Sequence, residues 1–159
     1  MEENATAGFV QKALEMGFMG LDTACQPKHY NEPGVGEGLR RFLIRGKSRE
    51  NLFVQTKFTP VTGQDPKNIP YDSNASLEEQ VKQSLGVSQN NLGPEPIDSL
   101  VLHSPLPDWD ELKQVWEALE STVDKGEDEK KEVSEIKYDD EKSLEQRYGF
   151  KLIIKEIRK

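Results

Sequence analysis

The sequence has little of three things that would define its class: cysteine, excess positive charge and long apolar runs. Its single cysteine, Cys25, excludes an internal disulfide and a zinc site built from cysteines, and it fits a reducing compartment. The 159 residues carry 21 basic and 29 acidic side chains, a formal net charge of −8. Because nucleic acids and anionic membranes attract concentrated positive charge, neither is expected as a partner.

The missing apolar runs also bear on location. No run approaches the roughly 20 residues that cross a bilayer, and residues 1–4 lack the basic flank and apolar stretch of a secretory signal, so we expect a cytoplasmic protein. Charge is spread unevenly, since residues 127–159 hold 9 basic and 10 acidic groups in 33 positions. This divides the chain into a globular part, residues 1–126, and a charged tail, residues 127–159, expected to be helical or disordered.

Helical and strand patterns alternate along the globular part. Apolar residues at helical spacing predict helices over residues 5–16, from 33 to about 46, from 76 until the proline at 94, and over 108–124. Short β-type runs predict strands at 20–22, 52–57 and 97–103. Strands that rejoin one sheet after each helix use right-handed crossovers and lie parallel. The predicted fold class is therefore α/β, with about three parallel strands, flanking helices and the charged tail.

Each predicted strand ends in an ionisable side chain: Asp22, Lys57 and His103. The carboxyl ends of parallel strands meet at one rim, so we expect these groups to lie close together, with Tyr30 from the loop after the first strand. Taken singly, each has an ordinary explanation. Asp22 could form an Asx turn, and Lys57 could be a solvated strand end. His103 could be satisfied by backbone groups, and Tyr30 could be a surface aromatic.

As a set, the four groups suit proton donation to a carbonyl oxygen. A phenol is a weak acid, and a neighbouring cation such as Lys57 makes its ionised form easier to reach. A partly buried lysine needs an anion to stay charged, which Asp22 would provide. His103 would hold the carbonyl oxygen or pass the proton. This is general-acid chemistry that requires neither a nucleophile nor a metal.

Four segments of the chain resemble, in order, the motifs of the aldo-keto reductases, and the likeness covers roughly residues 7–126. Members of that family are (β/α)8 TIM barrels that reduce aldehydes and ketones with hydride from NADPH. The segments are Gly20-Leu21-Asp22-Thr23-Ala24, Tyr30-Asn31-Glu32 with Val35-Gly36, Phe53-Val54-Gln55-Thr56-Lys57, and Leu102-His103-Ser104-Pro105.

The resemblance implies a role for each rim residue. Tyr30 would be the proton donor, Lys57 and Asp22 the pair that tunes it, and His103 the residue that orients the carbonyl. Trp109 would be a candidate wall of the substrate pocket, although packing at the start of a helix is the simpler explanation for it.

The chain also departs from the family pattern. The loop at residues 25–29 is about three residues longer than the commonest form, and Cys25 and His29 are expected to lie beside the site rather than act in it. A complete barrel takes about 250 residues, so the resemblance implies a truncated member with only the first half of the barrel. The first barrel strand and the later strands that hold NADPH have no counterpart here, which leaves the cofactor-binding residues unknown.

Glycines at 34, 36 and 38 do not match Gly-x-Gly-x-x-Gly and follow no strand directly, so we interpret them as glycines of a helix start rather than a phosphate loop.

Two functions follow as expectations. The first is NADPH-dependent reduction of a small aldehyde or ketone, weak or inactive in this truncated chain. The alternative is a non-catalytic interaction protein that uses open sheet edges and the charged tail, with self-association through those edges. The β-type run at residues 150–157 would suit such an edge.

Overall fold

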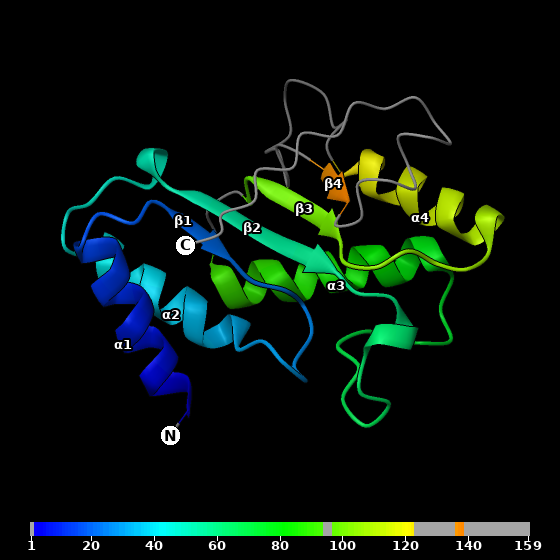
Figure 1. Ribbon diagram of the computed structural model, residues 1–159, viewed down its shortest axis with the longest axis horizontal. Coiled ribbons are helices and arrows are strands. Elements are labelled where there is room, and N and C mark those ends of the chain that lie inside the picture. Colours follow the sequence, from blue (N-terminus) through cyan, green and yellow to red (C-terminus); the bar gives the residue numbers. More distant parts are fainter. Residues whose placement is uncertain (1, 94–96, 123–135, 139–159) are drawn as a thin grey trace.

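The computed structural model describes residues 2–93, 97–122 and 136–138. Helices α1 (Glu2–Glu15), α2 (Glu32–Leu43), α3 (Leu77–Leu92) and α4 (Trp109–Ser121) alternate with strands β1 (Gly20–Asp22), β2 (Phe53–Phe58) and β3 (Ser99–Leu102) (Figure 1). Each of these elements lies within a few residues of its predicted position. Within this described part of the chain, no helix has both the length and the hydropathy of a membrane span.

The sheet has one more strand than the sequence predicted. Its order is β1-β2-β3-β4, and all neighbours are parallel. β4 (Ile136–Tyr138) pairs with β3 from Leu100 to Leu102. Residues 136–138 are therefore a strand, where the sequence predicted helix or disorder. The predicted edge run at 150–157 lies outside the described residues.

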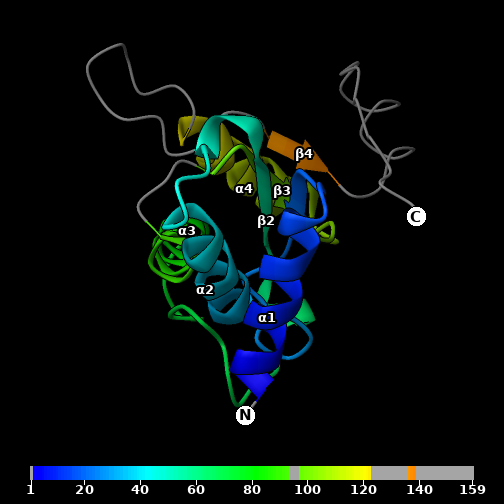
Figure 2. The ribbon, with the colours of Figure 1, turned by 90° about the vertical axis from the view of Figure 1, so that its left-hand side faces the viewer.

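The hydrophobic core lies between one face of the sheet and the helices. Alternate strand residues enter it, among them Val54, Phe58 and Leu100, and they share one cluster with residues of all four helices: Leu14, Leu39, Leu85 and Leu119. The helices pack in succession, α1 on α2, α2 on α3 and α3 on α4 (Figure 2). Since side chains alternate along a strand, Gln55 and Lys57 project from the opposite face.

Side-chain caps fix where three of the helices begin. The side-chain oxygen of Asn31 accepts from Gly34 N at 3.0 Å and starts α2, which places Tyr30 directly before the helix. The hydroxyl of Ser76 accepts from Glu79 N at 3.3 Å, as the sequence pattern predicted for α3. Asp108 caps α4 in the same way. Such a cap stabilises a helix by about 1 kcal/mol and sets its entry point.

The glycines of α2 let its neighbours approach closely. A Cβ built on Gly38 would lie 2.6 Å from Val10 Cβ of α1, and one on Gly36 would lie 1.9 Å from the carbonyl oxygen of Asn91 in α3. These contacts support the interpretation of the glycines as packing positions rather than a phosphate loop.

Two glycine substitutions should change stability in opposite directions. Gly36→Ala forces the backbone of α3 away and should lower the free energy of unfolding by about 2 kcal/mol or more. The matched control is Gly86→Ala in α3, where a Cβ meets nothing within 4 Å. It should raise the free energy of unfolding by about 0.5–1 kcal/mol, because alanine favours the helix. Urea denaturation of the two variants measures both changes, and equal effects would contradict this account of the packing.

The only cysteine is buried in the loop that follows β1. Cys25 is 2% exposed. Burial, together with the neighbouring Glu32 carboxylate, raises the pKa of the Cys25 thiol from 9.0 to about 11, although the hydroxyls of Ser84 and Ser88 act in the opposite direction. A buried thiol that keeps its proton behaves as a small apolar side chain.

The raised pKa predicts a loss of stability at high pH. Between about pH 9 and pH 11 the unfolded thiol ionises while the folded thiol does not, so this contribution is complete below pH 9 and is lost as pH rises through 11. Urea midpoints measured across that range should fall, and they should fall less in Cys25→Ala. Burial also raises the pKa of Tyr71, and the part of that rise that comes from Cys25 is lost in the variant, which makes its decline shallower still. An equally steep decline in the variant would contradict the prediction.

Candidate functional site

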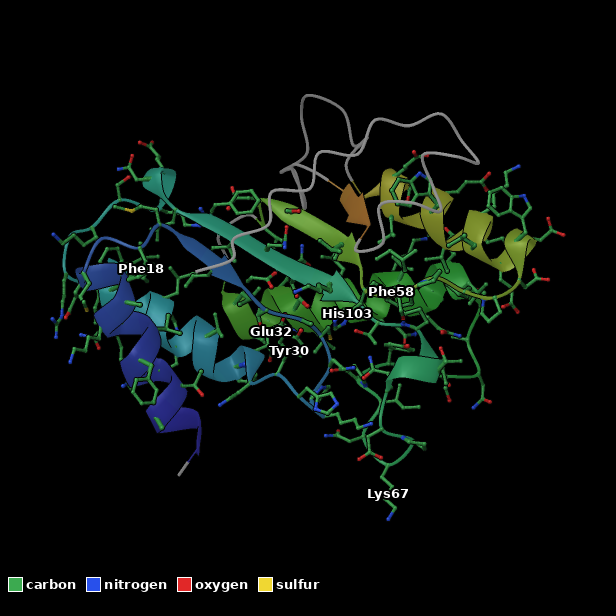
Figure 3. The ribbon with its side chains drawn as sticks, in the orientation of Figure 1. Phe18, Tyr30, Glu32, Phe58, Lys67 and His103 are labelled. Carbon is green, nitrogen blue, oxygen red and sulfur yellow. The ribbon has the colours of Figure 1, made fainter. Side chains whose placement is uncertain are left out.

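Three strand ends deliver the predicted ionisable groups to one rim. Asp22 is the last residue of β1, Lys57 is the penultimate residue of β2, and His103 follows the last residue of β3. The register pairs Asp22 with Gln55 and Lys57 with Val101, so the three ends lie side by side. Figure 3 shows Tyr30 and His103 close together beside the carboxyl end of β2. The structure thus brings together the four residues that the sequence singled out.

Lys57 and Asp22 form a close ion pair. The Lys57 Nζ lies 2.7 Å and 2.8 Å from the two carboxylate oxygens of Asp22, and 3.0 Å from the carbonyl oxygen of Thr23. Lys57 is 4% exposed, whereas the Asp22 side chain is 53% exposed and also accepts from Gln55 Nε2 at 2.7 Å. A buried ammonium is costly without an anion beside it, and the carboxylate meets that need.

The ammonium also lies over the ring of Tyr30. The Lys57 Nζ is 5.3 Å from the ring centroid, within the range of a cation–π contact. Its three close contacts, with Asp22 and Thr23, equal the number of its hydrogens. The ammonium therefore meets the ring of Tyr30 through space, while its hydrogens serve Asp22 and Thr23.

His103 also lies close to Tyr30. The Tyr30 Oη lies 3.5 Å from His103 Nε2, and the ring centroids are 5.5 Å apart with the planes at 73°. This is long for a hydrogen bond. A third oxygen placed between the two groups would reach both at an ordinary hydrogen-bond distance of about 2.8 Å. The pair can therefore hold a carbonyl oxygen.

The other nitrogen of His103 is anchored by a residue that sequence reasoning missed. His103 Nδ1 lies 2.8 Å from the hydroxyl oxygen of Thr59, which is 1% exposed. The carbonyl oxygen of Thr59 accepts from Tyr71 Oη at 2.6 Å and from Gln64 Nε2 at 3.1 Å. A signal existed, because Thr59 follows Lys57 by two positions and so falls on the same face of the strand.

A buried carboxylate holds the loop of Tyr30 from the helix side. Glu32, the first residue of α2, is 2% exposed and accepts from the hydroxyl of Thr56, from Ser88 Oγ at 3.0 Å and from Asn91 Nδ2 at 3.0 Å. Thr56 precedes Lys57 in β2, and the other two donors belong to α3. This network fixes Tyr30, two residues upstream of Glu32, relative to the strand that carries Lys57.

The remaining candidates lie around the rim. His29 is exposed in the loop before Tyr30, and Cys25 is buried in the same loop. Trp109 is the first residue of α4 and is 36% exposed, as its packing explanation allows. Its role as a wall of the substrate pocket stays a prediction.

A cavity of about 590 Å³ adjoins Tyr30 on the helix side. Its other walls come from α1, the loop after β1, the start of α2, and α3, with residues such as Phe9, Pro27, Pro33 and Val87. Asp22, Lys57, His103 and Trp109 are not part of its lining. This cavity is therefore separate from the space between Tyr30 and His103.

Comparison with known sequences identifies the family. The sequence model of the Aldo/keto reductase family matches residues 1–156, which extends past the stretch 7–126 in which the motifs stand. Methylglyoxal reductase DkgA of Escherichia coli K12 is 31% identical over 118 residues, covering 74% of this chain and 35% of that protein. Morphine 6-dehydrogenase of Pseudomonas putida is 32% identical over 121 residues, covering 76% of this chain and 35% of that protein. The chain spans about a third of the length of these relatives.

Solved structures agree on the fold. An aldo/keto reductase from Brucella melitensis superposes with a TM-score of 0.68 at 22% identity, covering 96% of this chain and 52% of that one. The deep-sea metagenomic aldo-keto reductase MGS-M4 gives 0.62 at 25% identity, covering 85% and 41%. A Bombyx mori aldo-keto reductase in complex with NADP gives 0.63 at 24% identity, covering 83% and 39%. The four-stranded sheet and its helices match part of a TIM barrel, and this chain belongs to the aldo-keto reductase family.

Proposed function

We propose that the rim is the proton-donating part of an NADPH-dependent carbonyl reductase that converts a small aldehyde or ketone to an alcohol. One observation carries the proposal: Tyr30 lies close to both partners, with its Oη 3.5 Å from His103 Nε2 and its ring centroid 5.3 Å from the ammonium of Lys57. A phenol, an imidazole and a cation in this arrangement suit general-acid catalysis at a carbonyl oxygen.

Each residue has a distinct part in the proposed reaction. Tyr30 Oη gives its proton to the carbonyl oxygen as the carbonyl becomes an alcohol. His103 Nε2 holds that oxygen against Tyr30. Lys57 stabilises the phenolate that proton donation leaves behind, and Asp22 keeps Lys57 charged in its buried position.

The hydride of such a reaction would come from NADPH, and the described residues do not fit its binding. The buried cation at the rim, Lys57, is already in contact with Asp22 and Thr23. The glycines at the start of α2 pack against α1 and α3, so their backbone is not presented to a phosphate. We therefore expect the 159-residue chain alone to turn over carbonyl substrates slowly or not at all.

Tyr30→Phe tests the role of the phenol. The informative protein is a chimera in which residues 7–126 replace the matching third of the Escherichia coli methylglyoxal reductase. NADPH consumption with methylglyoxal should be measurable in the chimera and should fall by about 100-fold or more in Tyr30→Phe, since a general acid contributes about 10²–10⁴. The unmodified 159-residue chain should stay at the background rate.

The control is His29→Asn, an exposed change in the same loop, which should keep the activity of the chimera. A folded Tyr30→Phe chimera that keeps its activity would sink the assignment of Tyr30. Turnover by the 159-residue chain above background would overturn the expectation that it lacks a place for NADPH.

A second candidate function, association of two copies, rests on the outer edge of β1, which pairs with no strand other than β2 within the described residues. Alternate residues of β1 and its flanks bond to β2: Met19 O accepts from Phe53 N at 2.8 Å, and Thr23 N donates to Gln55 O at 3.0 Å. The backbone groups of Gly20 therefore point away from β2, towards an edge on which another strand could pair. Beside that edge Phe18 is 59% exposed.

Phe18→Lys tests this second candidate. If copies associate through β1, sedimentation should show dimers of the unmodified chain in the hundred-micromolar range, and the edge lysine should weaken association by about tenfold or more. Ile44→Lys is the matched control, because Ile44 is 83% exposed beyond the end of α2. A chain that stays monomeric over the whole range, or equal effects of the two lysines, would rule out the edge as the contact.

A further inference from the structure

The contact between Thr59 and His103 has two arrangements with opposite consequences. In a neutral imidazole one nitrogen carries hydrogen and the other accepts, and a threonine hydroxyl can do either. The Thr59 Oγ1 therefore either donates to His103 Nδ1 or accepts from it across the 2.8 Å contact. If Thr59 donates to Nδ1, the ring hydrogen of His103 is on Nε2. If Thr59 accepts from Nδ1, Nε2 carries a lone pair instead.

Burial of Thr59 decides between the two. The residue is 1% exposed, and within the described part of the chain the hydrogen-bond partner of its hydroxyl is His103 Nδ1. If Nδ1 carried the hydrogen, the hydroxyl proton of Thr59 would have no acceptor in a place closed to water. An unsatisfied buried donor is costly, whereas donation from Thr59 to Nδ1 satisfies both groups.

We propose that Thr59 is a positioning residue that donates to His103 Nδ1 and thereby holds His103 as the tautomer with hydrogen on Nε2. The inference rests on the proposed reductase function for its chemical meaning. With hydrogen on Nε2, His103 donates to the carbonyl oxygen and Tyr30 keeps its proton for transfer. In the other tautomer, Nε2 would accept the proton of Tyr30 and compete with the substrate.

The surroundings of Thr59 hold its hydroxyl in this direction. Its carbonyl oxygen is bound by Tyr71 and Gln64. Its methyl group lies close to Gly63, where a built Cβ would come within 2.7 Å of Thr59 Cγ2. The branched Cβ of threonine restricts χ1, so this contact on the methyl group limits rotation of the hydroxyl away from His103.

Nitrogen NMR of the 159-residue chain, with ¹⁵N in the histidine rings, reads the tautomer directly. The chain has two histidines, and exposed His29 serves as the internal reference. At a pH where His103 is neutral, we expect the shift of a protonated nitrogen for Nε2 and of an unprotonated nitrogen for Nδ1. Thr59→Val should move the tautomer ratio about 2- to 10-fold towards hydrogen on Nδ1, because it removes one hydrogen bond. Thr59→Ser keeps the hydroxyl and should restore the original ratio.

Thr122→Val is the matched control, because it removes a buried hydroxyl that donates to Leu119 O at 2.7 Å and belongs to the residue that follows α4. It should leave the His103 resonances unchanged. A proton on Nδ1 in the unmodified chain would overturn the inference even if the Thr59 variants failed to fold. Unchanged His103 shifts in Thr59→Val, or no recovery in Thr59→Ser, would overturn it too. Since these spectra need neither substrate nor NADPH, failure of the reductase assignment in the Tyr30→Phe chimera is a separate result.

Discussion

The ion pair between Lys57 and Asp22 is the constraint on which the site depends. An ammonium taken out of water costs several kcal/mol unless an anion lies beside it, and the anion here comes from the neighbouring strand. The pair forms only if β1 and β2 meet in the observed register, with Asp22 opposite Gln55. The ion pair at the rim therefore forms only when β1 and β2 pair correctly. Because Asp22 is half exposed, water screens the pair, and its value lies in placing the ammonium near Tyr30 more than in stability.

A second carboxylate fixes the same strand from the opposite face. Thr56 and Lys57 are neighbours in β2, so their side chains project to opposite faces of the sheet. Thr56 meets Glu32 among the helices, and Lys57 meets Asp22 at the rim. Glu32 is satisfied by neutral donors from β2 and α3, which avoids a second cation near the site. The short segment from Tyr30 to Glu32 therefore links the packing of the helices to the position of the phenol.

Most of this arrangement could be predicted from the sequence, because the carboxyl ends of parallel strands lie together. Asp22, Lys57 and His103 were predictable as neighbours from that rule alone. β4 was not, because Ile136 and Tyr138 form too short a pattern and stand in a segment dominated by charged residues. The contact between Thr59 and His103 was missed: the spacing from Lys57 indicated the face on which Thr59 lies, but the contact itself depends on how the residues after two strand ends pack together. The role of Glu32 was hidden for the same reason, as its three donors are scattered over two elements.

The described residues bring the four rim groups together without a closed barrel, because these groups come from adjacent strands and the loop between them. Residues as far apart as Tyr30 and His103 meet through β1, β2 and β3, which pair directly with one another. Closure of a barrel would add strands beyond β1 and β4 and would change none of these pairings. Binding of a dinucleotide is different, because such a ligand is long and needs donors from several further loops. Under the proposed function, proton donation and hydride delivery thus make separate demands on the fold, and the four rim residues would serve the first.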